Sequence, residues 1–344
     1  MPPVANRRSR KWRLALIVLL VLAAAGIGYE QIGAYKDLER LPQIGRRFDI
    51  GGYSLNIFCS GEGAPTVVFD SGAGESGMAW SHIQTEVARR TRACWFDRAG
   101  YGWSDTGPYP RTSAQMSSEL HTLLQRAGIA PPYLLVGHSL GGLNVRVYAG
   151  LYPDEVAGAV LVDSAHEDEP RRAPRFMLGR GLPRLLWHPL WIAMQALRGL
   201  GILRLTAGSA GLPPDPERRT PDRVLAALRR QPKTIATLAG DATSPQSYAE
   251  AEASPGFGDR PLIVLTRGRI PAPERTSEMD RQYAAYMEVW MHEIQPKLAR
   301  LSTRGRQIIL PNSGHGIPEE APDAVVSAVA EVVAAVRGKP GTDR

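Results

Sequence analysis

The chain has 344 residues, of which 43% are hydrophobic and 22% are charged. This composition is ordinary for a globular protein with a sizeable core, and it excludes a chain dominated by disorder. The net charge of +7 is concentrated before residue 14, and the rest of the chain has 36 basic against 34 acidic residues. Because no folded basic face is expected on such a body, nucleic acid is not an expected partner. The residues of this basic arm are Arg7, Arg8, Arg10, Lys11 and Arg13.

An uncharged run, Leu14 to Gly28, follows the basic arm. With Trp12 and Tyr29 as interfacial flanks, it approaches the roughly 17 residues that a spanning helix needs. We therefore expect an uncleaved membrane anchor, with the basic arm cytoplasmic and the body of the chain extracytoplasmic. The run also fits a secretory signal ending in Ala23–Gly26, whose cleavage would give a secreted form. A buried soluble helix is the third interpretation.

Short apolar runs alternate with helix-like segments after a polar stretch that ends near residue 46. This alternation favours a mostly parallel sheet covered by helices on both faces, an α/β fold. We assign residues 47–166 and 260–338 to this core, and residues 1–46 to the arm, the anchor and a linker. The expected strands are 53–59, 66–69, 93–96, 133–136, 159–162, 261–266 and 307–310, and the expected helices are 80–90, 113–127, 143–150 and 324–336.

Residues 167–259 interrupt the alternation. They are rich in Arg, Pro, Leu and Trp and contain no β-rich run, so we expect several short helices. Ligand-binding loops of a parallel sheet lie at the carboxyl ends of its strands. An insert at this point of the chain is therefore interpreted as a helical cap over that end.

A turn typical of nucleophilic serines lies near the middle of the chain. Gly137-His138-Ser139-Leu140-Gly141 matches G-x-S-x-G, follows an apolar strand and precedes a helix. That setting is what the motif requires, since the turn is too tight for a Cβ two residues before or after the serine. A serine in an ordinary Gly-rich turn is the alternative. We predict Ser139 as a nucleophile, with the helix N-terminus directed at developing negative charge.

A serine hydroxyl is a weak nucleophile until a base takes its proton. His315 lies in Asn312–Gly316, just after the last expected strand, where it can reach the carboxyl end of the sheet. His166 is its rival at another strand end, and His138 is expected to point elsewhere along the turn. The remaining histidines lie in helix-like segments, where surface or packing roles suit them: His82, His121, His188 and His292.

The acid that orients the base is expected between the two in sequence, at a strand end. Asp163 comes directly after the strand 159–162, and we predict it as the acid. Glu274, Glu167 and Asp168 remain as alternatives, and Asp163 could merely cap the following turn. The strand that ends at Thr266 is followed by seven residues without a carboxylate before Glu274.

Backbone N–H groups must also be directed at the oxyanion of the reaction. One is expected from Leu140, immediately after the nucleophile. The other is expected from Ala73, in the loop Asp70-Ser71-Gly72-Ala73-Gly74 after a strand, or from a neighbour one residue away. A plain flexible loop is the alternative. These residues suggest no metal and no organic cofactor.

Four blocks in this order resemble the α/β-hydrolase superfamily, over about residues 48–336. They are Asp70–Gly74, Phe96–Asp105, Gly137–Gly142 and Ser313–His315. The resemblance implies an eight-stranded sheet in which only the second strand is antiparallel, lying beside the fourth. Two departures are visible: Ser71-Gly72 replaces the usual His-Gly, and the acid often found after the seventh strand is missing. Some relatives place it after the sixth, as Asp163 would be.

Two cysteines lie in expected strands, Cys59 at the end of one and Cys94 at the start of another. They form a disulfide only if the two strands are neighbours, and are otherwise two buried thiols. The resemblance places these strands side by side and so favours the disulfide.

The resemblance implies a serine hydrolase that cleaves a carboxylic ester, or a similar acyl bond, through an acyl-enzyme. The apolar cap residues Leu185, Trp187, Leu190 and Trp191 favour a small or moderately apolar acyl substrate. An amidase or peptidase with the same triad is one alternative. A membrane-tethered binding protein without catalytic activity is another. A serine at the elbow, in place of aspartate, disfavours haloalkane dehalogenase and epoxide hydrolase chemistry.

Overall fold

The computed structural model describes residues 7–174, 187–207, 221–241, 245–270 and 277–338. Its centre is one eight-stranded sheet with the order β1-β2-β4-β3-β5-β6-β7-β8. Strand β2 pairs antiparallel with β1 and β4, and the other neighbours pair in parallel, so β2 alone runs against the rest. The expected sheet is confirmed. Its strands are β1 (Arg46–Asp49), β2 (Ser54–Ser60), β3 (Thr66–Asp70), β4 (Ala93–Asp97), β5 (Tyr133–His138), β6 (Val156–Val162), β7 (Leu262–Arg267) and β8 (Gly305–Leu310).

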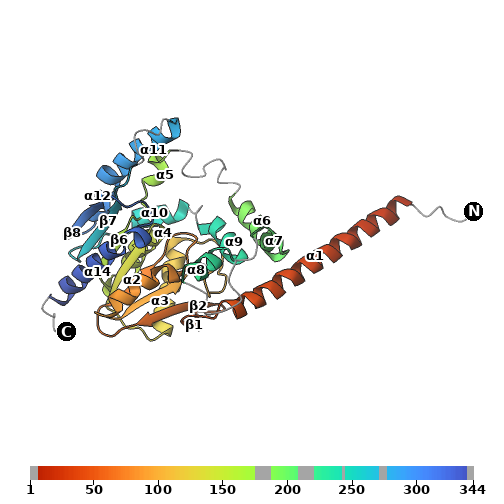
Figure 1. Ribbon diagram of the computed structural model, residues 1–344, viewed down its shortest axis with the longest axis horizontal. Coiled ribbons are helices and arrows are strands. Elements are labelled where there is room, and N and C mark those ends of the chain that lie inside the picture. The colour runs from red at the N-terminus through yellow and green to blue at the C-terminus, as the bar shows by residue number, and fades with distance from the viewer. Residues whose placement is uncertain (1–6, 175–186, 208–220, 242–244, 271–276, 339–344) are drawn as a thin grey trace, which may run out of the picture.

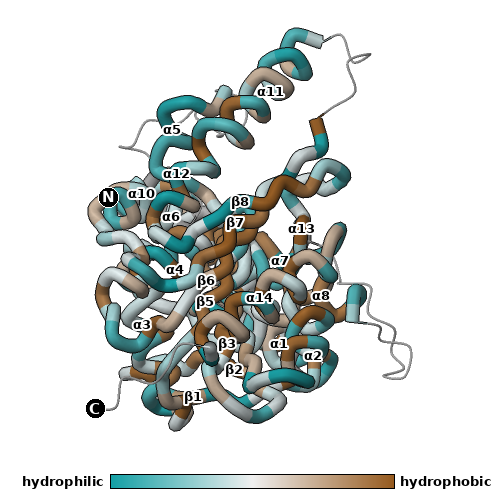
Figure 2. Tube along the Cα trace, turned by 90° about the vertical axis from the view of Figure 1, so that its left-hand side faces the viewer, coloured by the Kyte–Doolittle hydropathy of each residue, from teal (hydrophilic) through white to brown (hydrophobic). Residues whose placement is uncertain are grey.

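Helices cover both faces of the sheet (Figure 1). Helices α2 (Ser81–Ala88) and α14 (Pro322–Arg337) pack on one face, over side chains such as Val67 and Val160. Helices α3 (Ser113–Arg126), α4 (Leu140–Leu151) and α12 (Gln295–Ala299) pack on the other, over Val68 and Leu161. Because successive strand residues point to opposite faces and both faces are covered, the inner strands are buried and mostly apolar, which is visible as the brown centre of Figure 2.

The two cysteines face each other across the antiparallel pair formed by β2 and β4. Cys59 and Cys94 are register partners and are joined by a disulfide. The pairing follows from the position of β2, which the resemblance implies.

The N-terminal helix is longer than the apolar run. Helix α1 (Arg7–Arg40) extends away from the body of the protein (Figure 1). Residues 30–40, which we expected to belong to a polar linker, continue the helix. Residues 30–40 contain no proline, and most of them are good helix formers, so the helix continues until shortly before Pro42. The segment Arg10–Asp37 is long and apolar enough to cross a membrane, with a mean hydropathy of 2.0 and no buried residue in its most apolar window.

The described parts of residues 167–259 are helical and contain no strand. The helices are α5 (Glu169–Arg172), α6 (Trp187–Gly199), α7 (Ile202–Ala207), α8 (Pro221–Arg229), α9 (Pro232–Asp241) and α10 (Pro245–Ala253). Leu185 and Glu274 lie outside the described residues.

A helical excursion that the sequence did not reveal separates β7 from β8. Helix α11 (Glu278–Val289) runs into a π-helical turn, Trp290–Ile294, and then into α12. Such turns widen a helix by one residue and often lie at functional sites. Here the turn carries Trp290 to the carboxyl end of the sheet.

Candidate active site

Ser139 occupies the sharp turn between β5 and α4. Its backbone has φ 53° and ψ −118°, a conformation that few residues other than glycine adopt and that costs about 1–3 kcal/mol. The neighbouring backbone leaves no room for side chains. A Cβ on Gly137 would lie 2.4 Å from the carbonyl oxygen of Gly141, and one on Gly141 would lie 2.4 Å from that of Asp70. The glycines therefore allow the tight turn that lifts Ser139 above the end of β5.

The structure brings Ser139, His315 and Asp163 together. His315, in the loop between β8 and α13 (Ile317–Glu320), has its Nε2 atom 3.1 Å from Ser139 Oγ. Its Nδ1 atom lies 2.5 Å from Asp163 Oδ2. Because the carboxylate can only accept, Nδ1 donates to it, and Nε2 is left to accept the proton of the hydroxyl. This geometry is the one that a nucleophile, a base and an orienting acid require.

The protein fixes the carboxylate of Asp163 tightly. This residue follows β6 directly, has φ 40° and is fully buried. Its Oδ1 atom accepts hydrogen bonds from the indole of Trp290 at 2.9 Å and from the backbone N–H of Arg267 at 3.2 Å. The Nε atom of Arg267 lies 2.8 Å from Oδ2. Burial acts to raise the pKa of Asp163, but Arg267 and His315 outweigh it and hold the pKa below its usual range.

The imidazole of His315 is the most exposed of the three side chains, with 45% of its side chain exposed. Partial burial lowers its pKa below the ordinary value, although the carboxylate of Asp163 acts in the opposite direction. The neutral form, which can accept a proton, therefore prevails near neutral pH.

His138 makes contacts that the sequence did not predict. Its Nε2 atom donates a hydrogen bond of 2.8 Å to the backbone carbonyl of His315, and the two rings lie 4.8 Å apart. On its other side, Nδ1 lies 3.8 Å from Glu75 Oε2. His138 therefore points away from the hydroxyl of Ser139, as expected, and faces the loop that carries His315. Its place at the end of β5, next to that loop, was the available signal.

The loop after β3 is held by the buried guanidinium of Arg98. Arg98 donates to the carbonyl of Ser71 at 2.5 Å and to that of Gly72 at 2.7 Å. Since a trans peptide directs its C=O and N–H to opposite sides, the N–H of Ala73 points away from Arg98. Ala73 also packs against the cluster that contains Leu140. Within the described residues, neither the backbone N–H of Ala73 nor that of Leu140 donates a hydrogen bond to another backbone group.

The rival residues have other partners. The Nδ1 atom of His166 accepts a bond from the N–H of Asp168, and burial lowers its pKa to about 4. Glu167 forms an ion pair with Arg146, and Asp168 with Lys297. The structure places none of these side chains against His315.

Ionic contacts join the helical insert to the rim of the site. Arg229, the last residue of α8, donates to Glu75 at 2.8 Å and to Glu319 at 2.9 Å. Burial alone would raise the pKa of Glu75, but His138 and Arg229 lower it to about 2. Arg229 and Glu319 also line a cavity of about 830 Å³. One arginine of the insert thus bridges the loop after β3 and the helix after His315.

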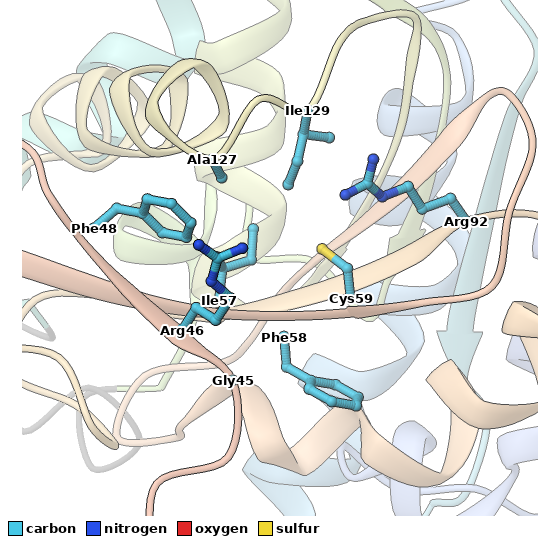
Figure 3. Close-up of a pocket in the computed structure, with 9 residues that line it drawn as sticks. All are labelled: Gly45, Arg46, Phe48, Ile57, Phe58, Cys59, Arg92, Ala127 and Ile129. Carbon is cyan, nitrogen blue, oxygen red and sulfur yellow. The ribbon is translucent and has the colours of Figure 1, made fainter.

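A second hollow, of about 380 Å³, lies by the outer strands β1 and β2 (Figure 3). Arg46, Arg92 and Cys59 are among its lining residues, and Ser139, His315 and Asp163 are not. The disulfide therefore borders this hollow, away from the candidate active site. Among the described residues, no group of three or more His, Cys, Asp or Glu side chains could hold a metal ion.

The chain is similar to known proteins, both to a family model and to curated relatives. Residues 67–328 match the model of the alpha/beta hydrolase family. The uncharacterized protein YbdG of Bacillus subtilis is 30% identical over 152 residues, which are 44% of this chain and 46% of that protein. The chain spans less than half the length of the first curated relatives that it matches.

Two solved structures show the same fold. An esterase from Thermogutta terrifontis superposes with a TM-score of 0.56 and 22% identity, over 85% of this chain and 99% of that one. The enol-lactonase from Burkholderia xenovorans gives a TM-score of 0.54 and 20% identity, over 84% and 100%. At such identities the likeness concerns the fold alone.

Proposed function

This chain belongs to the alpha/beta hydrolase family, and on that premise we propose that it is a serine hydrolase that cleaves a carboxylic ester or a similar acyl bond. The observation that carries the proposal is the continuous chain of contacts from Ser139 Oγ through the imidazole of His315 to Asp163. A serine, a histidine and a buried carboxylate in this order are the groups that catalyse acyl transfer in serine hydrolases.

The proposed reaction has two halves. Ser139 Oγ attacks the carbonyl carbon while His315 Nε2 takes its proton, and Asp163 stabilises the imidazolium that forms. The imidazolium then protonates the oxygen of the leaving group, which departs as an alcohol and leaves an acyl-serine. Water, deprotonated by the same imidazole, attacks the acyl carbon. The bond from this carbon to Ser139 Oγ then breaks, Oγ takes the proton back from His315, and the acid is released.

We assign the oxyanion hole to the N–H groups of Ala73 and Leu140. The N–H of Leu140 lies at the N-terminus of α4, where the helix dipole favours negative charge. Arg98 supports the orientation of the Ala73 N–H through the carbonyl of Gly72. Donors fixed in advance in this way stabilise the tetrahedral intermediate without reorganisation.

Labelling with a fluorophosphonate probe tests the reaction class. We expect wild-type protein and Ser118→Ala to be labelled and Ser139→Ala to remain unlabelled. Ser118 is an exposed serine on α3 and serves as the matched control. Well-folded wild-type protein that resists the probe would favour a membrane-tethered binding protein without catalysis.

An amidase or peptidase with the same triad is the second enzymatic candidate. p-Nitrophenyl esters of rising chain length, assayed beside aminopeptidase substrates, separate the two. We expect ester turnover to exceed amide turnover by orders of magnitude.

We further propose that α1 anchors the protein and that residues 167–259 form a cap over a core of residues 47–166 and 260–338. The charge-free run in α1 and the basic arm before it support an anchor with an extracytoplasmic body. Resistance of the protein to alkaline extraction from membranes, with an intact N-terminal tag, tests the anchor. Loss of the tag with release of a soluble body would indicate a cleaved signal and a secreted form.

A further inference from the structure

Helices α6 and α7 form a hairpin that lies against α1 (Figure 1). At the tip of the hairpin the backbones are nearly in contact. A Cβ on Gly26 would lie 2.3 Å from the carbonyl oxygen of Leu200, and one on Gly201 would lie 2.7 Å from that of Gly26. Glycines on both sides thus permit the approach, which fixes the hairpin at one level of α1.

That level is the end of the uncharged run. Gly26 comes three residues before Tyr29, so at 1.5 Å per residue the contact lies about 5 Å inside the apolar segment. Tyrosine and tryptophan side chains collect at the boundary between hydrocarbon and water. If α1 spans a bilayer, the tip of the hairpin lies at this boundary.

The charges of the hairpin suit such a position. Residues 187–207 contain no acidic residue, and their only Lys or Arg side chains are Arg198 and Arg204. Arg204 forms ion pairs with Glu30 at 2.8 Å and Asp37 at 2.7 Å, both in α1. These acids therefore face the hairpin, where their charge is partly compensated.

Large apolar side chains are exposed on both partners. On the hairpin, Leu205 is 68% exposed and Ile202 39%, and Ile192 is exposed as well. On the part of α1 beside them, Ile32 and Tyr35 are more than half exposed. Exposed apolar side chains gathered beside a spanning segment mark a surface that contacts lipid.

The hairpin is also connected to the candidate active site. The ring of Tyr109 packs at a tilt against that of Trp191 of α6, with 4.6 Å between the ring centroids, and α6 packs along α9. Leu238 of α9 in turn lies 3.6 Å from where a Cβ on Gly74 would be, in the loop that carries Ala73. Packing contacts thus link the exposed hairpin through α9 to the loop that carries Ala73.

We propose that the α6–α7 hairpin rests on the bilayer and that the substrate is a lipophilic ester that enters from the membrane. The inference depends on the anchor and the hydrolase activity proposed above, and it specifies the substrate class. The hairpin holds the cap at the lipid surface, so that a long acyl chain has only to pass from the bilayer over α9 to reach Ser139.

The depth of single residues in vesicles tests the placement. Because the only two cysteines form the disulfide, an introduced cysteine can be labelled selectively with an environment-sensitive fluorophore. The full chain is reconstituted in phosphatidylcholine–phosphatidylglycerol vesicles that contain brominated lipid as a quencher. Leu19→Cys reports on the anchor and Leu205→Cys on the hairpin. Met279→Cys is the control, because Met279 is an exposed residue of α11.

We expect quenching at positions 19 and 205 and none at 279. Quenching at 19 without quenching at 205 overturns the inference and leaves the anchor intact. Absence of quenching at 19 overturns the anchor and the inference together.

Turnover provides the second measurement. Leu205→Ser is expected to lower hydrolysis of a long-chain ester embedded in vesicles by about tenfold, because an apolar contact with lipid is lost. Hydrolysis of soluble p-nitrophenyl acetate should not change, and Met279→Ser should affect neither substrate. An equal loss on both substrates, or no loss on either, contradicts the proposal. If even wild-type protein hydrolyses no ester, the proposed function fails, while the quenching result still stands by itself.

Discussion

Replacement of Asp163 by asparagine removes one charge from the proposed triad and keeps the shape of the side chain. In wild-type protein the carboxylate accepts from His315 Nδ1 at 2.5 Å, from Trp290 and from the N–H of Arg267. An amide at this position has one oxygen in place of two. If its NH₂ group faces the imidazole, His315 can no longer donate through Nδ1, so Nε2 carries the proton and cannot serve as a base.

The magnitude follows from the charges. Attraction between an imidazolium and a carboxylate with charge centres about 4 Å apart is about 4 kcal/mol at an effective dielectric constant of 20. Its loss corresponds to about 10³-fold in rate, and the wrong tautomer adds to that loss. We therefore expect Asp163→Asn to lower kcat by about 10³- to 10⁴-fold with little change in KM, in the range known for such triads.

The assay is hydrolysis of p-nitrophenyl butyrate at saturating concentration, with the melting temperature as a check of folding. Asp168→Asn and Glu274→Gln are matched controls, each of which removes a carboxylate that was an alternative for the acid. Both should retain kcat within a few fold. A folded Asp163→Asn protein with near-normal kcat, or a larger loss in either control, would refute the assignment of the acid.

Three further outcomes are expected. The pH profile of kcat/KM should fall on the acid side with a midpoint below 6.5, because the pKa of His315 is lowered and only the neutral imidazole accepts a proton; a midpoint above 7 would contradict this. His138→Ala should lower kcat about tenfold, the worth of one hydrogen bond to the His315 carbonyl, and His138→Gln should recover part of it if the bond positions the loop. Replacement of both Cys59 and Cys94 by alanine should lower the free energy of unfolding by about 3–4 kcal/mol, measured by urea denaturation, because the disulfide closes a loop across a sequence separation of 35 residues. Reduction of the wild-type protein should have the same effect, and equal stability of the two forms would contradict the loop-closure argument.

The sequence predicted best what depends on local pattern. The elbow around Ser139 and the strand-end positions of Asp163 and His315 are set by short motifs next to apolar strands. Parallel strands bring their carboxyl ends to one edge, so residues 176 positions apart become hydrogen-bond partners. The register of Cys59 with Cys94 needed the family resemblance, because spacing alone does not determine which strands pair.

The sequence could not reveal contacts that only the tertiary structure creates. The continuation of α1 through residues 30–40 is accompanied by ion pairs of Glu30 and Asp37 with Arg204, far along the chain. Trp290 reaches Asp163 only because a π-helical turn follows α11, and no periodicity in the sequence indicated that turn. For His138, the pattern gave its place beside the nucleophile but not the loop that it contacts.

The position of the proposed acid is explained by its neighbour on the next strand. The sequence has Asp163 after β6 and a basic residue, Arg267, at the end of β7, where an acid could have been expected. Since β6 and β7 pair in parallel, these two strand ends lie side by side, and the arginine forms an ion pair with the aspartate. A fully buried carboxylate without such a partner would take up a proton and lose its hold on His315. Arg267 also lies over the ring of Trp290, whose indole donates to Asp163, at 5.2 Å. The acid after β6 and the arginine after β7 therefore belong together. Arg267 keeps the carboxylate of Asp163 ionised, and the indole of Trp290 holds it in place.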